Sequence, residues 1–163
     1  MMGFPGSGKT TAALWVSELT GATHIWADRE RTKRFAKPTH SREETAELYS
    51  ALNLDVEALL RQGKSVVYDA NFNQRRTRRH WRKLAMDSGA ATVVLWVDVS
   101  PETAYQRTKN HNKTRVFTLA RSVFDRMAGH LQPPQADEQY IKIDGTKLTR
   151  TDVAAALRPY SAS

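Results

Sequence analysis

The stretch Gly3-Phe4-Pro5-Gly6-Ser7-Gly8-Lys9-Thr10 decides how the rest of the chain is interpreted, because it matches G-x-x-x-x-G-K-[ST] at every fixed position. Its glycines let backbone N–H groups turn inward onto the oxygens of an anion. Thr10, followed by Thr11, opens a helix whose positive end would face the same anion. The stretch therefore predicts a cradle for the phosphates of a nucleoside triphosphate, because an ordinary glycine-rich turn needs neither the lysine nor the threonine.

Two side chains of the cradle supply chemistry of their own. Lys9 brings a full positive charge to the β- and γ-phosphates, and the Thr10 hydroxyl is placed to ligate a magnesium ion that bridges them. We therefore expect ATP, or another nucleoside triphosphate, and Mg²⁺ as cofactors.

The residues before the cradle depart from the usual context of this motif. A strand is expected there, and only Met1 and Met2 precede Gly3. In a doubly wound sheet that strand is central and buried on both faces, so its absence would leave a slot in the core. We expect that the chain as given begins late, at an internal Met. The alternative is a loop attached to a weakened sheet, and the in-frame codons upstream would distinguish the two.

Composition excludes several classes of protein. The chain has 163 residues, no cysteine and a formal net charge of +8, which indicates one domain without disulfides or thiolate metal sites. No apolar run approaches membrane-spanning length and no signal peptide is visible, so we expect a cytoplasmic protein without a membrane partner. The positive charge favours polyanionic partners such as nucleotides, nucleic acids or acidic membrane surfaces.

Strand and helix patterns alternate along the chain. Strands are expected at 23–27, 65–69, 92–99 and 140–144, and helices at 10–19, 41–61, 74–87, from 101 onward, at 118–129 and at 152–157. Residues 29–40 are polar and basic, which is typical of a loop. Ser41 with Glu44 forms a capping box for the second helix, and Asn73 is expected to cap the third. The alternation predicts one three-layer α/β domain over residues 1–163, with a mostly parallel sheet covered by helices on both faces.

Acidic residues follow two of the expected strands. Asp28 ends the strand at 23–27, where open α/β sheets hold their ligands, and is a candidate base for an acceptor hydroxyl. Arg31 is well placed to grip a substrate phosphate. The alternatives are that Asp28 caps a turn or pairs with Arg29, and that Arg31 is a solvated charge. Asp69 could hold magnesium directly or through water, unless Asp69 and Asn71 merely form a turn.

Two basic stretches could contact phosphates. The first leaves one helix and enters the next, and could fold over the triphosphate as a lid within residues 107–129. Its basic side chains are Arg107, Lys109, His111, Lys113 and Arg115. The second is the helix at 74–87, which is either a track for a nucleic-acid backbone or a solvated face. The histidines show no metal-ligand spacing.

Taken together, several motifs resemble the small P-loop kinases of the AAA-type, zeta-toxin-like superfamily. They are GFPGSGKT at 3–10, DRER at 28–31, DANF at 69–72, VDVSPET at 97–103, Arg107, and LQPPQADE at 131–138. The most similar family is the kinase domain of bacteriophage-type polynucleotide 5′-hydroxyl kinase. Zeta-toxin and chloramphenicol phosphotransferase relatives are looser matches.

The resemblance implies a role for each matching residue. Asp28 would activate the acceptor hydroxyl, Arg31 would grip the neighbouring substrate phosphate, and Asn71 would close the next strand beside the acceptor. Lid arginines would contact the transferred phosphate, the first of them Arg107. Arg115 is our choice for the second, although His111 and Lys113 compete with it. The loop at Gly145 and Thr146 would lie near the adenine.

The sequence thus predicts an ATP-dependent phosphotransferase that acts on the 5′-hydroxyl of a polynucleotide. The catalytic residues would be Lys9, Asp28, Arg107 and Arg115. Nucleic acid or another phosphorylated acceptor would be the partner besides the nucleotide. The alternatives are a kinase for a sugar, nucleoside or antibiotic, and a nucleotide-binding module without catalysis.

Overall fold

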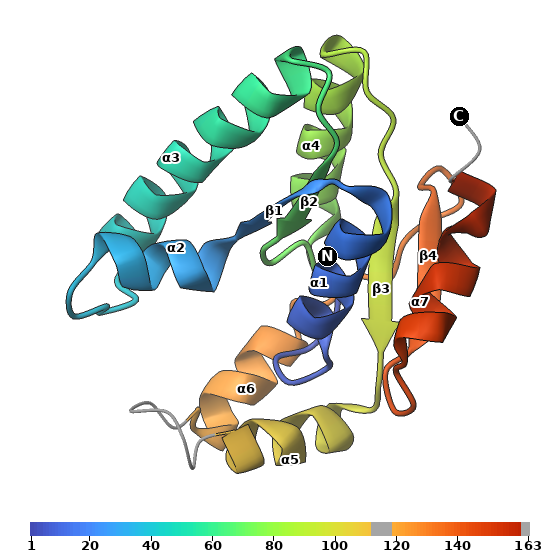
Figure 1. The fold of residues 1–163 in the computed structure, drawn as a ribbon. Coiled ribbons are helices and arrows are strands. Elements are labelled where there is room, and N and C mark those ends of the chain that lie inside the picture. Colours follow the sequence, from blue (N-terminus) through green and yellow to red (C-terminus); the bar gives the residue numbers. More distant parts are fainter. Residues whose placement is uncertain (112–118, 161–163) are drawn as a thin grey trace.

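The computed structural model describes residues 1–111 and 119–160. Strands and helices alternate as predicted and form an α/β fold (Figure 1). The strands are β1 (Thr23–Trp26), β2 (Val66–Asp69), β3 (Val94–Asp98) and β4 (Tyr140–Asp144). The helices are α1 (Lys9–Thr20), α2 (Ala27–Arg34), α3 (Arg42–Arg61), α4 (Arg75–Asp87), α5 (Pro101–His111), α6 (Arg121–Ala128) and α7 (Arg150–Leu157), with a 3₁₀ turn at Arg158–Tyr160.

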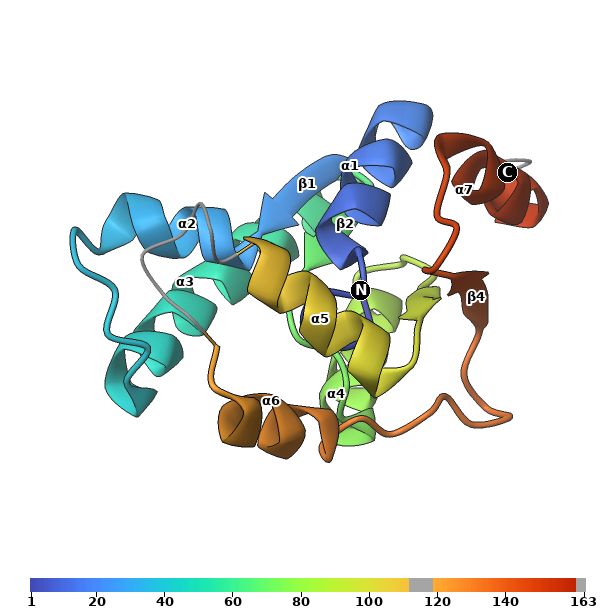
Figure 2. The same ribbon diagram turned by 90° about the horizontal axis from the view of Figure 1, so that it is seen from below.

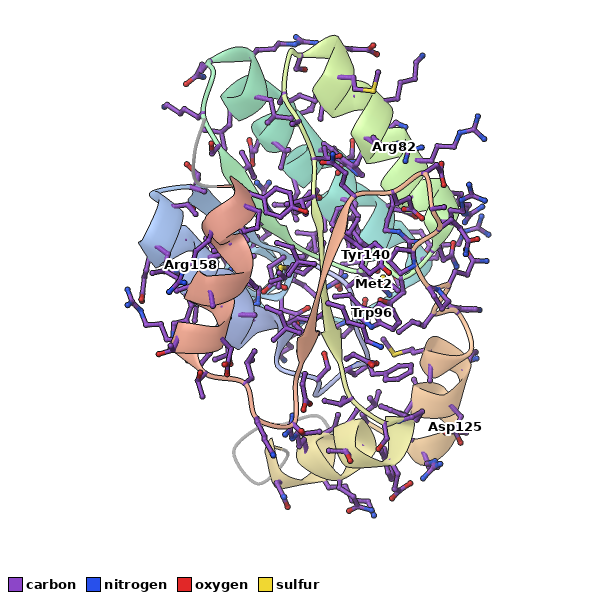
Figure 3. All side chains as sticks on the ribbon, turned by 90° about the vertical axis from the view of Figure 1, so that its right-hand side faces the viewer. Met2, Arg82, Trp96, Asp125, Tyr140 and Arg158 are labelled. Atoms are coloured by element: carbon purple, nitrogen blue, oxygen red, sulfur yellow. The ribbon has the colours of Figure 1, made fainter. Side chains whose placement is uncertain are left out.

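The strands form two parallel pairs, β1 with β2 and β3 with β4. Met1 and Met2 lie between the pairs. The amino group of Met1 donates to the Tyr68 carbonyl of β2 at 3.0 Å, and Met2 forms an isolated parallel bridge with Trp96 of β3 (Figure 3). These two residues therefore occupy the central position in the sheet where the strand before the cradle is expected.

Helices cover both faces of the strands. Figure 2 shows α1 and α7 on one side of the sheet and α4 on the other. On the first side, α1 and α7 bury a cluster with β3 and β4, made up of Ala12, Leu95, Val97, Ile141, Ile143, Val153 and Leu157. On the second side, a cluster centred on α3 contains Ala27, Leu48, Leu52, Ala70 and Phe72. The predicted three-layer arrangement is confirmed, since helices cover both faces of the sheet, although β4 at its edge is buried on one face only.

The segment after β1 differs from the prediction. A loop was expected at 29–40, but α2 runs to Arg34, and Asp28 lies in its first turn rather than at the tip of a strand. The helix is short and polar, yet its first turn is acidic and its last turn is basic, which complements the helix dipole. Glu30 and Lys33 also pair along it.

The capping predictions are correct for one helix and wrong for another. Ser41 accepts a hydrogen bond from the Glu44 backbone N–H at 3.1 Å, and α3 begins at Arg42. The Glu44 carboxylate does not return to Ser41, since it bonds to the loop before it and to α2. The cap of α4 is Gln74 rather than Asn73, whose side chain turns to the cradle instead.

The expected lid lies partly outside the described residues. α5 continues to His111, and α6 covers Arg121–Ala128 of the expected helix at 118–129. Residues 112–118, which include Lys113 and Arg115, fall in the gap, so their lid contacts stay a prediction. Within the described ranges, none of the helices combines the length and the apolar character needed to span a bilayer.

Candidate active site

The cradle wraps around the start of α1. Gly3, Gly6 and Gly8 all have positive φ, at 142°, 81° and 102°, a backbone conformation that glycine adopts without strain. Gly8 caps α1, which begins at Lys9. The loop therefore brings successive amides and a helix N-terminus to one place, the arrangement that binds phosphate.

Lys9 lies across the cradle and near two carboxylates. Its ammonium donates to the carbonyls of Gly3 at 3.1 Å and Phe4 at 2.8 Å. Burial lowers the pKa of Lys9 to about 8, and the charges of Asp69 and Asp28 oppose this shift. Both predicted acids are therefore close enough to act on the cradle lysine, although one ends β2 and the other begins α2.

Asn73 holds the cradle in place, a role that the sequence did not indicate. Its Oδ1 accepts from the Gly3 N–H at 2.9 Å, and its Nδ2 donates to the Gly3 carbonyl at 3.1 Å. The side chain is buried, so the pair of bonds is shielded from water. Asparagine before a helix usually indicates a cap, and nothing local distinguishes this one from a cap.

The buried ion pair of Arg78 and Glu138 holds the backbone at Asn73 in place. Arg78 of α4 donates to the carbonyls of Phe72 and Asn73, both at 3.0 Å. It also binds the Glu138 carboxylate through two bonds of 2.7 and 3.0 Å. The bond from Arg78 lowers the pKa of Glu138. The late LQPPQADE stretch thus contributes an acid that fixes the loop beneath the cradle.

The predicted basic track on α4 is partly neutralised. Arg75 and Arg82 each pair with Asp137 at 3.0 Å, and Arg78 is the buried partner of Glu138. Three of the six basic residues that could form the track thus have an acidic partner. The six are Arg75, Arg76, Arg78, Arg79, Arg82 and Lys83. The solvated-face alternative is closer to the observed structure than a continuous track for a nucleic-acid backbone.

Asp69 is a candidate magnesium ligand, because it is a buried carboxylate with an oxygen that lacks a hydrogen-bond partner among the described residues. It ends β2 in register with Trp26 and is 5% exposed. Its Oδ2 has no hydrogen-bond partner among the described residues and lies 3.5 Å from His24 Nε2. Within the same ranges no three acids, histidines or cysteines gather as a metal site. Thr10 and Asp69 fit Mg²⁺, which typically takes one or two protein ligands and completes its shell with phosphate and water oxygens.

An aromatic residue that the sequence did not indicate, Tyr49, lies near the residues predicted to bind the acceptor. Tyr49 of α3 packs against the cluster of Ala27 and its neighbours. Burial raises the pKa of Tyr49, a hydrogen bond from the Asn71 backbone opposes that shift, and the charges of Asp28, Arg31 and Asp69 also act on the hydroxyl. Tyr49 therefore lies among the residues predicted to handle the acceptor.

Arg31 and Asn71 both have protein partners. Arg31 is 7% exposed, forms a close ion pair with Glu44 and donates to Thr45 Oγ1 at 3.2 Å. The Asn71 Oδ1 accepts from the Asn73 N–H at 3.2 Å, a local turn that starts at Asn71 and differs from the turn of Asp69 and Asn71 considered from the sequence. Acceptor contacts by Arg31 and Asn71 stay predictions.

Arg107 connects α5 to the loop after β4. It donates to the carbonyls of Gly145 at 2.7 Å and Thr146 at 3.2 Å. Gly145 also lies against the cradle, since a Cβ placed there would be 2.8 Å from the Ser7 carbonyl oxygen. The structure thus brings Arg107 and Gly145 to one edge of the cradle, whereas Arg115 lies outside the described residues.

Comparisons with known proteins agree with this geometry. A family model described as an AAA domain matches residues 1–134. A search of curated proteins finds no significant match.

Several solved structures share the fold. A sugar kinase from Janibacter sp. has a TM-score of 0.67 at 21% identity, covering 99% of this chain and 95% of that one. A gluconokinase from Sinorhizobium meliloti has a TM-score of 0.67 at 20% identity, covering 96% and 86%. The Mycobacterium tuberculosis APS kinase, solved with AMPPNP and APS, has a TM-score of 0.64 at 19% identity, covering 96% and 94%. Because the family model covers most of the chain, this protein belongs to the AAA-domain family of P-loop proteins.

Proposed function

We propose that this protein is a P-loop kinase that transfers the γ-phosphate of ATP to a hydroxyl group of a small polar molecule. One observation carries the proposal: the cradle lysine, Lys9, lies within the electrostatic influence of both Asp28 and Asp69. A nucleotide-binding module needs the lysine, whereas a kinase also needs an acid that can receive the proton of an acceptor.

The residues divide the transfer between them. The acceptor oxygen attacks the γ-phosphorus, its proton passes to the Asp28 carboxylate, and the bond from the γ-phosphorus to the bridging oxygen breaks to release ADP. Lys9 and the cradle amides hold the β- and γ-phosphates and stabilise their charge. A magnesium ion held by Thr10 and Asp69 would neutralise charge on the same oxygens. Arg107, at the edge of the cradle, would contact the nucleotide.

The size of the acceptor is the finer part of the proposal. The structures that share this fold include enzymes named for a sugar, gluconate and APS, all small acceptors. Arg75, Arg78 and Arg82, which a polynucleotide could use, are paired with acids. The net charge of +8 still favours a polyanion, so the 5′-hydroxyl of a polynucleotide remains the second candidate.

Transfer of labelled γ-phosphate to a panel of sugars, sugar acids, nucleosides, antibiotics and 5′-hydroxyl oligonucleotides tests both candidates. Salt separates them, because binding of an oligonucleotide falls steeply with ionic strength and binding of a neutral sugar does not. Labelling of oligonucleotides alone would contradict the small-molecule assignment.

The base is tested with Asp28→Asn, matched by Glu30→Gln two residues later on the same helix. We expect Asp28→Asn to slow transfer about 100-fold or more while ATP still binds. Glu30→Gln should leave the rate near that of the parent protein, because Glu30 forms an exposed pair with Lys33 along the same helix. Equal rates for Asp28→Asn and the parent would remove Asp28 from the mechanism, and retained ATP binding without transfer to any acceptor would favour the non-catalytic module.

A further inference from the structure

Two side chains on neighbouring strands bring two unpaired polar atoms close together. Nε2 of His24 on β1 lies 3.5 Å from Oδ2 of Asp69 on β2. Both atoms are buried, and neither has a hydrogen-bond partner among the described residues. Because a buried polar group without a partner is costly, two of them at this distance indicate a role beyond packing.

The register of the strands places both side chains on one face of the sheet. His24 lies beside Val67, and Trp26 lies beside Asp69. Side chains at matching positions of parallel neighbours point to the same face. Val67 belongs to a buried cluster with Ala13 of α1, so this is the face that α1 covers (Figure 1). The two atoms therefore meet between the strands and α1.

His24 reaches the carboxylate from the side away from the phosphate cradle. Asp69 is the last residue of β2, whereas His24 lies two positions before the strand partner of Asp69. The cradle follows Met2, which runs parallel to β3, so it lies at the carboxyl edge of the strands. Burial lowers the pKa of Lys9 in the cradle, and the charge of Asp69 opposes that shift. Asp69 thus lies between His24 and the cradle.

The imidazole of His24 is held in one plane by Trp26. The two rings are stacked, with centroids 5.9 Å apart and planes at 1° to each other. The side chain of His24 is 11% exposed, which leaves little access for water. A small shift would bring Nε2 within hydrogen-bond distance of Oδ2, and contacts at active sites often tighten in this way when the ligand binds.

We propose that His24 is a positioning residue, whose Nε2–H bonds to Oδ2 of Asp69 and orients the carboxylate toward the divalent cation of the nucleotide. The inference rests on the magnesium site of the proposed function, and His24 acts only through Asp69. An imidazole with its proton on Nε2 is a donor, and a carboxylate that accepts this bond keeps its other oxygen for an ion. Hydrogen bonds to a metal ligand typically contribute about 10–100-fold to metal affinity.

The test measures the affinity for Mn²⁺, which takes the same oxygen ligands as Mg²⁺. Mn²⁺ is titrated into an equimolar complex of the full chain with a non-hydrolysable ATP analogue, and bound metal is determined from the lost EPR signal of free Mn²⁺. His24→Phe removes the donor and keeps a ring to stack on Trp26. We expect it to weaken Mn²⁺ binding about 10–100-fold, while the analogue without metal binds as it does to the parent.

Two further variants show whether the donor is the cause. His24→Gln places an amide N–H at a similar distance along the side chain and should restore most of the Mn²⁺ affinity. His80→Phe makes the same change as His24→Phe at an exposed histidine of α4 and should bind Mn²⁺ like the parent. An unchanged affinity in His24→Phe would overturn the proposal, and so would equal weakening in His24→Phe and His24→Gln. Nitrogen hyperfine coupling from an imidazole to bound Mn²⁺ would overturn it too, because His24 would then bind the ion directly.

Asp69→Asn separates the failure of this inference from the failure of the proposed function. We expect Asp69→Asn to weaken Mn²⁺ binding, and the addition of His24→Phe to weaken it little further, because His24 acts through Asp69. Weakening by Asp69→Asn together with an unchanged His24→Phe would remove His24 and leave the magnesium site in place. Parental affinity in Asp69→Asn would remove the magnesium site and this inference with it.

Discussion

Replacing Asn73 with alanine should loosen the cradle from the sheet. The substitution removes the acceptor for the Gly3 N–H and the donor to the Gly3 carbonyl. The carbonyl keeps the bond from Lys9 at 3.1 Å, but the buried N–H is left without a partner. Loss of the bond at the Gly3 N–H should therefore reduce stability more than loss of the bond at the Gly3 carbonyl.

The magnitude follows from that inequality. An orphaned buried donor costs about 1–3 kcal/mol, and the lost bond at the carbonyl adds roughly 1 kcal/mol. A total of about 2–4 kcal/mol corresponds to a fall in the thermal midpoint of roughly 4–16 °C for a chain of this size. Affinity for ATP should also fall about tenfold, which is 1.4 kcal/mol, because the loop must then be ordered on binding.

Urea unfolding and titration with a non-hydrolysable ATP analogue measure the two effects separately. Asn110→Ala is the matched control, since Asn110 is exposed on α5 and its loss should change stability by less than about 0.5 kcal/mol. If Asn73→Ala unfolds at the same urea concentration as Asn110→Ala, the role assigned to Asn73 is refuted.

Three further predictions concern other parts of the site. The pKa of Lys9 is about 8, so Lys9 loses its charge between pH 7 and pH 9.5, and the ATP affinity measured by calorimetry should fall over that range. The unliganded chain should gain stability over the same range, because its unfolded form still binds the proton. A flat affinity profile would count against the role of Lys9. Burial opposes the shift, but hydrogen bonds lower the pKa of Glu44 to about 2, so the thermal midpoint of Glu44→Gln should lie below the parent's at pH 7. This gap should shrink at pH 3, because the unfolded parent binds a proton at Glu44 there while the folded parent keeps the carboxylate largely ionised. An unchanged gap would show that the charge of Glu44 is not what stabilises this region. Gly145→Ala places a methyl group against the Ser7 carbonyl and should weaken ATP binding. Gly129→Ala is the control and should leave ATP binding unchanged, because the nearest atom to its added methyl group lies at 3.5 Å. Equal ATP affinities for the two variants would contradict the packing of Gly145 on the cradle.

The sequence alone determined the features that depend on local backbone conformation. The glycine pattern at 3–10 requires positive φ and a helix immediately afterwards, and the structure has both. The strand predicted at 140–144 is β4 with the same bounds. Alternation of strands and helices was sufficient to predict the three-layer parallel fold, because parallel strands need crossover helices on both faces.

Only the tertiary structure decided what each polar side chain bonds to. Asn73 has the sequence context of a cap but bonds to Gly3, seventy positions away. Glu44 has the spacing of a capping box, yet its carboxylate holds Arg31 of the preceding helix. Capping propensity and periodicity act over a few neighbouring residues, whereas these partners meet only through tertiary packing, of α2 on α3 for Arg31 and Glu44 and of the cradle beside β2 for Gly3 and Asn73. For that reason the sequence located the phosphate cradle, while the residues that hold it in place emerged from the packing of the sheet.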